Sequence, residues 1–393
     1  MGDARHSRRD FLRGKAALTE AADVVEGAID AIVESVAPTP AEHALGGTAS
    51  PEIARRRRVV TLARRAMACE WELRLVSTES EDHTPAGLAA LDVVERVEDR
   101  LTVYRDTSDL IELNRAAADG PAPIDGDLLR LLRLCDTLHR DTDGAFDPTS
   151  GPLSRVWGFH RREGRLPSDE EIAAALETVG WLHVAIDEAA GLVRFDRDGV
   201  ELNSNSIGKG WALDRAGEVL AERGVADSLM HGGRSTLLAR GSNRLQGHDA
   251  GWKAGVRHPL APDRRLAEFT LHNEAFSTSG SGTQFFEHEG RRYGHVIDPR
   301  TGWPSDSLYS VSLMAPTAAE ADALSTAAFV LGIDGTAELC RRRPGLRALV
   351  LAPADLAAEA EPAVIDAGVA VYAFAMDGTD WRARATPAAG GAG

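Results

Sequence analysis

A carboxylate and a hydroxyl stand four residues apart in the segment 316–327, whose other residues are mostly small. The segment predicts a helix, and this spacing places Asp322 and Thr326 on one face, one turn apart. Small neighbours let another group approach that face closely, and two hard oxygen ligands suit magnesium or calcium. A purely structural alternative stays open, in which Asp322 pairs with a basic side chain and Thr326 bonds back to its own helix.

Two further segments carry groups suited to phosphate chemistry. The run 276–283 is small and rich in hydroxyls, and we expect a loop whose backbone N–H groups cradle an anion. His295 follows in a short β run before an Asp-Pro-x-Thr-Gly turn, and an imidazole suits a general base near neutral pH. The alternative is an ordinary loop and a histidine satisfied within a sheet.

Lys209 stands at the start of a predicted helix, after the polar segment 203–206. Helix N-termini and lysines both attract phosphate, although the spacing is not that of a Walker loop. The segment 143–159 holds two prolines and three glycines and predicts a rigid loop. Its aromatic residues Phe146, Trp157 and Phe159 either stack on a flat ring or pack beneath the loop.

Strand and helix patterns mix between residues 58 and 380 without regular alternation, and no Gly-x-Gly-x-x-Gly follows a strand. We therefore expect an α+β fold and not a doubly wound nucleotide-binding fold. Asp125 is expected to cap a helix, and Ser168 with Glu171 forms a capping box. Further helices are expected to begin near Ala86, Gly210 and Thr317. Strands are expected at 58–62, 70–76, 183–186, 192–195, 236–239, 267–271, 309–314 and 348–351.

The composition is that of a globular protein: 393 residues, 43% of them apolar, can bury a sizeable core. Acidic residues outnumber basic ones by 60 to 44, and the formal charge of −16 disfavours nucleic acid or anionic lipid as the main partner. The three cysteines, Cys69, Cys135 and Cys340, are far apart and predict neither a disulfide framework nor a zinc site. No apolar run approaches the length of a membrane span, so no direct span is expected.

Both ends of the chain are predicted to lie outside the main domain. The run Ser7-Arg8-Arg9-Asp10-Phe11-Leu12 resembles a twin-arginine export signal. The charged segment that follows predicts an amphipathic helix over 21–36, not the apolar stretch such a signal needs. Residues 1–57 are therefore assigned to this helix and a linker; a cytoplasmic location is favoured and export stays open. Residues 58–380 form the main domain, and 381–393 a disordered tail.

Taken in chain order, these segments resemble the FAD:protein FMN transferases, the ApbE family. The resemblance covers about residues 60 to 350, and one motif alone is weak, whereas seven in the family's order are specific. The motifs are Ala66-Met67-Ala68-Cys69, Leu101-Thr102-Val103-Tyr104 leading to 108–114, Phe146-Asp147-Pro148-Thr149, Ile207-Gly208-Lys209-Gly210, Ser277-Thr278-Ser279-Gly280, His295-Val296-Ile297-Asp298-Pro299 and Ala321-Asp322-Ala323-Leu324-Ser325-Thr326.

The resemblance implies a mixed sheet-and-helix domain with a flavin cleft, FAD as substrate, Mg²⁺, and an acceptor flavoprotein subunit with a Ser/Thr flavinylation site. It implies that His295 deprotonates the acceptor hydroxyl and that Lys209 stabilises the phosphoryl oxygens. Asp322 and Thr326 match magnesium ligands, helped by the backbone carbonyl of Ser206. The positions implied to contact FAD are Met67, Tyr104, Ala145, Phe146, Asp147, Asn203, Lys209 and Val296.

Two positions depart from the family's pattern. Asn203 stands where the family usually has aspartate, and Arg234 where it often has the carboxylate of Asn-Ala-Gly-Gly-Asp. Two alternatives to protein flavinylation stay open: the first needs the same residues as the transferase, and the two departures motivate the second. One is a magnesium-dependent FAD pyrophosphatase, in which water replaces the acceptor hydroxyl. The other is a catalytically silent FAD-binding protein.

Overall fold

The computed structural model describes residues 29–31, 57–78, 81–243, 251–280, 282, 284–377 and 381–383. At its centre lies a nine-stranded sheet of order β16-β17-β15-β14-β11-β8-β7-β3-β2, in which neighbouring strands are antiparallel. Its strands are β2 Arg58–Ala66, β3 Cys69–Ser77, β7 Ser228–Gly232, β8 Thr236–Arg240, β11 Ala275–Gly280, β14 Ser310–Ala315, β15 Arg347–Pro353, β16 Val364–Asp366 and β17 Val369–Phe374.

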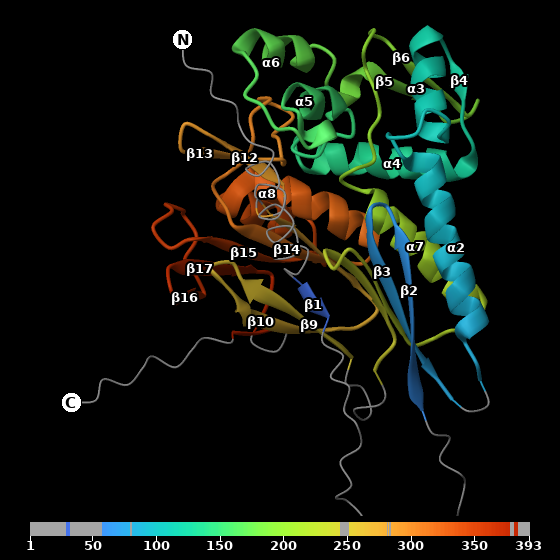
Figure 1. Ribbon diagram of the computed structural model, residues 1–393, viewed down its shortest axis with the longest axis vertical. Helices are drawn as coiled ribbons and strands as arrows, with labels where there is room; N and C mark the ends of the chain where they lie inside the picture. The colour runs from blue at the N-terminus through green and yellow to red at the C-terminus, as the bar shows by residue number, and fades with distance from the viewer. Residues whose placement is uncertain are drawn as a thin grey trace, which may run out of the picture.

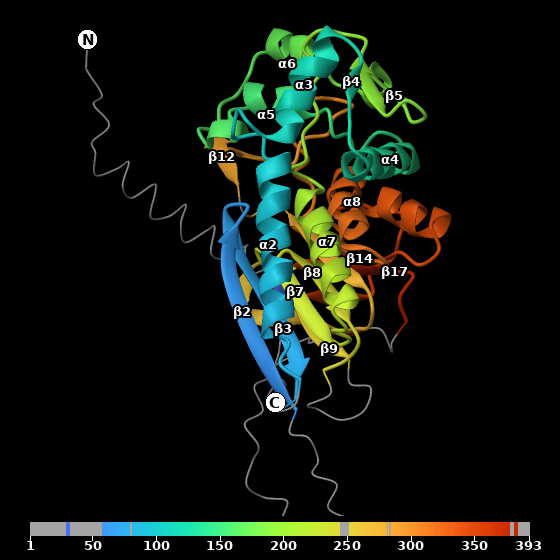
Figure 2. The ribbon, with the colours of Figure 1, turned by 90° about the vertical axis from the view of Figure 1, so that its right-hand side faces the viewer.

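Three helices, α2 Thr84–Leu101, α7 Gly208–Glu222 and α8 Ala318–Arg342, pack on one face of this sheet (Figures 1 and 2). Alternation along β3 sends Trp71, Leu73 and Leu75 into the core beneath them. The helices α7 and α8 cross closely at their N-termini, because Gly210 has no Cβ: one placed there would lie 2.1 Å from the Ala318 carbonyl oxygen. This close approach brings the start of α7 against the start of α8.

A smaller sheet of order β1-β9-β10-β18 covers the opposite face of the large sheet. A second core of buried side chains, including Trp252, Phe269 and Phe276, joins the two sheets. The large sheet is therefore buried on both sides, by helices on one and by strands on the other. The strands of the smaller sheet are β1 Ile29–Ala31, β9 Trp252–His258, β10 Ala261–Leu271 and β18 Trp381–Ala383.

A third, mainly helical region lies beyond one end of α2 and α7, at the top of Figure 1. The hairpin of β12 Phe285–His288 and β13 Arg291–Gly294 packs against it, because Phe286 and Tyr293 join Trp157 and Phe159 in one aromatic cluster. The packing alternative for Trp157 and Phe159 is thus confirmed. The elements of this region are α3 Asp109–Asp119, β4 Ala122–Pro123, α4 Gly126–Asp141, α5 Gly151–Val156, the 3₁₀ turn η1 Phe159–Arg161, α6 Asp169–Leu176, the 3₁₀ turn η2 Trp181–His183, β5 Val184–Asp187 and β6 Leu192–Phe195.

The α+β prediction is confirmed, and so are both predicted caps. The Asp125 side chain accepts from two backbone N–H groups of α4, and Ser168 with Glu171 forms the full capping box of α6. The helix α3 was missed, although Ser108 caps it by accepting from the Ile111 N–H. All eight predicted strands are present. Most of their ends shift by one or two residues, but β2 extends to Ala66 and β10 begins at Ala261.

Four predictions for local structure need correction. Of the predicted helix 21–36, the structure describes only Ile29–Ala31, and these residues form a strand that pairs with β9. Of the predicted disordered tail, Trp381–Ala383 form β18 and pair with β10. In both cases pairing with a distant strand overrides the local pattern; the other residues of the two segments lie outside the described residues. The expected loop 276–283 is strand β11 up to Gly280, and the rigid loop 143–159 includes helix α5.

Among the described residues, one helix, α8, is long and apolar enough to cross a membrane by length and composition. The sequence analysis had expected no apolar run of that length. Its apolar window is 56% buried within the fold, and the helix packs against β11 and β14. Length and composition of this kind are also those of a buried core helix. The expectation about apolar runs is corrected for this segment.

Candidate active site

A buried polar centre lies where α8 packs on β8 and β11. The Asp322 side chain is 5% exposed; its Oδ2 accepts from the Gly210 N–H at 3.0 Å. Its Oδ1 accepts from Thr236 Oγ1 at 3.0 Å and from Ser277 Oγ at 3.4 Å. Burial raises the pKa of Asp322, and the charge of Lys209 and these three donors oppose that rise. A carboxylate in this setting gains from a nearby positive charge.

Thr326 follows one turn after Asp322 and lies among further hydroxyls. Its Oγ1 is 3.3 Å from the Asp322 backbone oxygen and 3.0 Å from Ser279 Oγ. Ser277 and Ser279 alternate along β11 and therefore both face α8. The phosphate cradle predicted for this segment is wrong in one respect: the backbone of β11 pairs with β8 and β14, so its hydroxyls, not its N–H groups, line the site.

The structural alternative for the Asp322–Thr326 pair holds in part. Thr326 does bond back to its own helix, as that alternative supposed. Asp322, however, forms no ion pair within the described part of the chain, and its partners are hydroxyls and one backbone N–H. The pair therefore keeps a buried carboxylate whose charge no side-chain cation neutralises by direct contact.

Lys209 lies in the first turn of α7 and donates a hydrogen bond to Ser235 Oγ. Its charge lowers the pKa values of both His295 and Asp322, so it lies close to both groups. Ser206 lies in the turn that directly precedes α7. Because the Gly210 N–H reaches Asp322, the start of α7 is directed at the polar centre, and Ser206 is near it.

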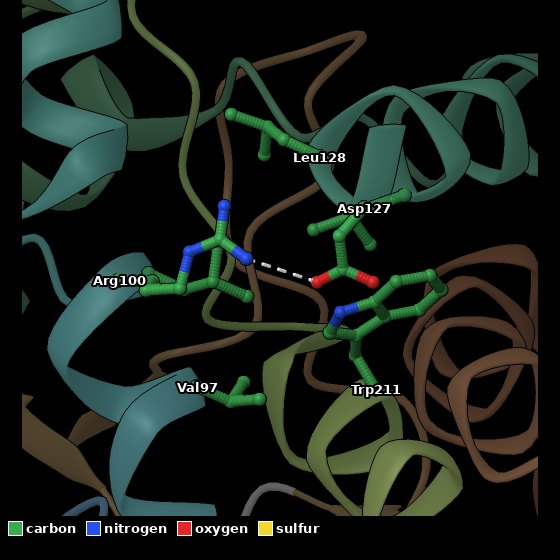
Figure 3. A pocket seen from close by; sticks show the side chains of 7 residues that line it. Val97, Arg100, Asp127, Leu128 and Trp211 are labelled. Atoms are coloured by element: carbon green, nitrogen blue, oxygen red, sulfur yellow. Dashed lines mark hydrogen bonds and ion pairs between the residues drawn. The ribbon is translucent and has the colours of Figure 1, made fainter. Parts of the chain in front are cut away.

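Trp211 is a buried residue in the first turns of α7, and the centroid of its ring lies 4.3 Å from the Arg215 guanidinium carbon. Figure 3 shows Trp211 beside Asp127 of α4, which forms an ion pair of 3.2 Å with Arg100 of α2. The cavity between these side chains has a volume of only about 10 Å³, close to the smallest that holds one water. This region positions α7 and offers no room for a substrate.

His295 directly follows β13 and is fixed by one carbonyl. The Gln284 oxygen lies 3.0 Å from the His295 backbone nitrogen and 3.2 Å from Nδ1. A neutral ring that donates from Nδ1 carries its lone pair on Nε2. Burial lowers the pKa of His295, Lys209 lowers it further, and the bond to Gln284 opposes both. The imidazole is therefore neutral at pH 7 and able to accept a proton.

Four of the predicted flavin contacts lie on loops or partly exposed segments. Met67 lies in the β2–β3 turn with φ 49°, and its N–H donates to Glu98 Oε2 at 2.8 Å. Tyr104 is 63% exposed and stacks on His160 with ring centroids 4.9 Å apart. Val296 is buried beside His295. The Asn203 side chain accepts from the Asn205 N–H at 2.8 Å, which holds the turn before α7.

The other predicted contacts, Ala145, Phe146 and Asp147, are buried. Phe146 is 1% exposed, so in this structure its ring follows the packing alternative. Its N–H donates to Thr142 Oγ1 at 3.1 Å, and its carbonyl oxygen lies 3.1 Å from His139 Nδ1. Asp147 accepts from Thr149 N at 2.8 Å, from Thr149 Oγ1 at 2.6 Å and from Trp181 N at 3.0 Å. Its carboxylate therefore ties two loops together.

A groove of about 290 Å³ adjoins this loop. It runs between the 139–147 segment and the Asp-Pro-Arg-Thr-Gly turn that follows His295. Arg300 stands five positions after His295, so the base and this end of the groove lie at most about 18 Å apart. The sequence reading missed His139 and Arg300; Arg300 stands within a motif it had quoted. The lining residues are His139, Gly144, Asp147, Leu176, Val179, Gly180, Pro299 and Arg300.

The two departures from the family's pattern occupy different places. Asn203 keeps a structural hydrogen bond in the turn before α7. Arg234 is exposed at the tip of the β7–β8 hairpin, with φ 55°, and its guanidinium lies 4.0 Å from Glu70. The neighbouring Ser235, which the sequence reading did not single out, is the residue that contacts Lys209.

The oxygen donors around Asp322 fit a hard divalent cation. Among the residues that the structure describes, no group of three or more His, Cys, Asp or Glu gathers as a metal site. One buried carboxylate with raised pKa, surrounded by hydroxyls, is a set that Mg²⁺ accepts when waters and substrate phosphates supply the remaining ligands.

The chain resembles known proteins over most of its length. The model of the ApbE family matches residues 67–350. A FAD:protein FMN transferase of Salmonella typhimurium is 32% identical over 248 residues, 62% of this chain and 70% of that protein. One of Haemophilus influenzae is 28% identical and covers 72% of this chain and 84% of its own length.

Solved structures resemble the whole fold. The flavin transferase ApbE from Vibrio cholerae superposes with a TM-score of 0.70 at 24% identity, over 81% of this chain and 98% of that one. The Pseudomonas stutzeri flavinyl transferase ApbE, in its apo form, superposes with a TM-score of 0.69 at 26% identity, over 81% of this chain and 95% of that one.

Proposed function

Because this chain belongs to the ApbE family and is a transferase, we propose that it transfers FMN from FAD to a serine or threonine hydroxyl of an acceptor flavoprotein, with Mg²⁺ as cofactor and AMP as the second product. The observation that carries the proposal is the hydrogen bond from the N–H of Gly210 to Asp322, which brings the neighbouring Lys209 beside this buried carboxylate. The charge of Lys209 also lowers the pKa values of Asp322 and His295, so a base, a cation and a candidate metal ligand from three distant segments lie within electrostatic reach of one another.

The base acts on the acceptor. A neutral hydroxyl is a poor nucleophile until a base takes its proton, and Nε2 of His295 is free to take it because Nδ1 faces Gln284. The acceptor oxygen forms a bond to the FMN phosphorus as the bond to the bridging pyrophosphate oxygen breaks. AMP leaves with that oxygen and its electron pair, and the proton passes from His295 to solvent.

Lys209 and the candidate metal ligands would stabilise the negative charge of the phosphate groups. Lys209 in the first turn of α7 adds its ammonium to the N-terminal end of the helix dipole, and both favour phosphoryl oxygens. Asp322, Thr326 and the carbonyl of Ser206 are the groups that would hold Mg²⁺. The ion would neutralise negative charge on the pyrophosphate oxygens when bound. The surrounding hydroxyls keep Asp322 oriented until then.

The flavin contacts are proposed at Met67, Tyr104, Asn203 and Val296, and at the loop of Ala145 and Phe146. Exposed Tyr104 offers a ring face for stacking. Gly144 and Asp147, which flank Ala145 and Phe146 in the chain, line the groove that also includes Arg300. This supports binding of FAD between the helical region and the polar centre.

The test is incubation of the purified protein with FAD, Mg²⁺ and an acceptor peptide with a central threonine. The peptide is separated under denaturing conditions and examined for flavin fluorescence and for the added mass of FMN. A His295→Ala variant is the control. We expect a flavinylated peptide with the wild type and none with the variant.

The other outcomes decide between the alternatives. AMP with free FMN, and no modified peptide, would contradict transfer and indicate a pyrophosphatase. Bound FAD without AMP release, repeated with an acceptor protein in place of the peptide, would indicate a silent binding protein.

A further inference from the structure

Two neighbouring hydroxyls of one hairpin hold two opposite charges. Ser235 accepts the hydrogen bond of the Lys209 ammonium. Thr236, the next residue, donates to Asp322 Oδ1 at 3.0 Å. The β7–β8 hairpin therefore contacts the cation with one residue and the carboxylate with the next.

Lys209 and Asp322 lie near each other but form no direct contact. The N–H of Gly210, the residue after Lys209, donates to Asp322 Oδ2 at 3.0 Å, but no ion pair joins Lys209 and Asp322 in the described part of the chain. A lysine has a flexible four-carbon stem, and attraction between charges is strong in a buried site. Without another partner, Lys209 would be expected to close onto Asp322.

The hairpin is a rigid support for Ser235. Its two tip residues, Gly233 and Arg234, have φ values of 61° and 55°, as in the tight turns that match strand twist. The Gly233 N–H donates to the Glu70 carbonyl at 2.8 Å, and the Ser235 carbonyl accepts from the Thr278 N–H at 2.8 Å. Ser235 is thus fixed by strands on both sides.

We propose that Ser235 is a positioning residue that holds Lys209 away from Asp322. The separation leaves the ammonium available to phosphoryl oxygens and the carboxylate available to a divalent cation. The proposal rests on the FMN transfer proposed above, because it assigns those two tasks to Lys209 and Asp322. It also gives the hairpin a role that does not depend on Arg234, which is directed at Glu70.

The experiment is a double-mutant cycle read by binding. Mg²⁺ alone is titrated calorimetrically into the wild type, Ser235→Ala, Lys209→Met and the double variant. We expect Ser235→Ala to weaken Mg²⁺ affinity about tenfold, the value of one ordinary hydrogen bond, because Lys209 then occupies Asp322. In the Lys209→Met background the same change should have no effect.

Two controls isolate the hydroxyl. Ser235→Thr keeps it and should retain wild-type affinity. Ser312→Ala removes a buried hydroxyl from the neighbouring strand β14, where Ser312 Oγ pairs with Thr278 Oγ1 at 2.7 Å, and should also leave Mg²⁺ binding unchanged. An equal loss from Ser235→Ala with and without Lys209, or no loss at all, would overturn the proposal.

The experiment distinguishes a failure of the proposed FMN transfer from a failure of the role proposed for Ser235. If Mg²⁺ binding shows the expected coupling between Ser235 and Lys209 but the protein transfers no FMN, the role of Ser235 is supported and the proposed reaction is contradicted. If the wild type binds no Mg²⁺, the metal part of the function is wrong. The same cycle is then read on FAD affinity, where coupling between Ser235 and Lys209 again supports the positioning role and additivity contradicts it.

Discussion

Two buried aspartates, Asp147 in the helical region and Asp322 on α8, differ in the donors that surround them. They are 6% and 5% exposed, and each accepts three hydrogen bonds. Asp147 is held by two backbone N–H groups and one hydroxyl, whereas Asp322 is held by one backbone N–H and two hydroxyls. A hydroxyl can rotate and present its lone pair, but a backbone N–H cannot. Burial alone therefore does not mark a reactive carboxylate; the kind of donor does.

The largest effect is expected from Asp322→Asn. The amide keeps an acceptor for the Gly210 N–H but removes the charge that would hold Mg²⁺, so FMN transfer should fall by about 1000-fold, or about 4 kcal/mol. Transfer rate at saturating FAD, together with the melting temperature, provides the measurement. Transfer within tenfold of wild type would show that Asp322 is as structural as Asp147.

Asp147→Ala should act on stability instead. It leaves the Thr149 and Trp181 N–H groups buried without their acceptor, at a cost of about 3 to 5 kcal/mol in the free energy of unfolding. Urea unfolding gives this value, and the turnover number of the remaining folded enzyme should change far less than in Asp322→Asn. A stable variant with 1000-fold lower turnover would reverse the comparison.

The same contrast explains what the sequence could predict about the site. The relation of Asp322 to Thr326 is local, because four residues of helix place them on one face, and small neighbours mark that face. Thr149, two residues after Asp147, is a local donor, but the other donors of the two aspartates come from far along the chain: Trp181 is 34 residues from Asp147, and Gly210 is 112 residues from Asp322. No spacing rule reaches that far, so the link from Asp147 to Trp181 was not predictable.

The fold was predictable to a similar degree. Capped helices such as α4 and α6 carry their signals within a few residues, and the eight predicted strands have strong apolar patterns. The strand β11 was missed because Ser277, Thr278 and Ser279 are typical of loops, and only the neighbours β8 and β14 make them a strand. The same holds for β1 and β18, which pair with β9 and β10.

A third aspartate, the partly buried Asp214 of α7, sharpens the comparison with a smaller effect. It accepts from the Ala318 and Ala319 N–H groups at the start of α8, at 2.8 and 2.9 Å, and burial raises its pKa to about 6. A raised pKa means that its contribution to stability is full below the unfolded value and is lost as pH rises through about 6.

Asp214→Asn removes this titration. Between pH 4 and pH 7, the free energy of unfolding of the wild type should fall relative to the variant by about 2 to 3 kcal/mol, which is two pKa units converted to energy. Urea unfolding of both proteins across this range measures the difference. If the difference in the free energy of unfolding between wild type and variant stayed constant over this pH range, the N–H groups of α8 would be keeping Asp214 ionised against the effect of burial.

The smallest effect concerns the charge of Lys209, which lowers the pKa of Asp322. The same charge lowers the pKa of His295, so Lys209→Met should raise that pKa, and protonation of the base should begin at higher pH. The titration of the His295 Cε1 proton by NMR in FAD-free protein measures it without turnover. Lys253→Met, an exposed lysine of β9, is the matched control and should leave the titration unchanged. An unchanged His295 in Lys209→Met would mean that burial alone keeps the base neutral, and that the polar centre around Asp322 and the base titrate independently.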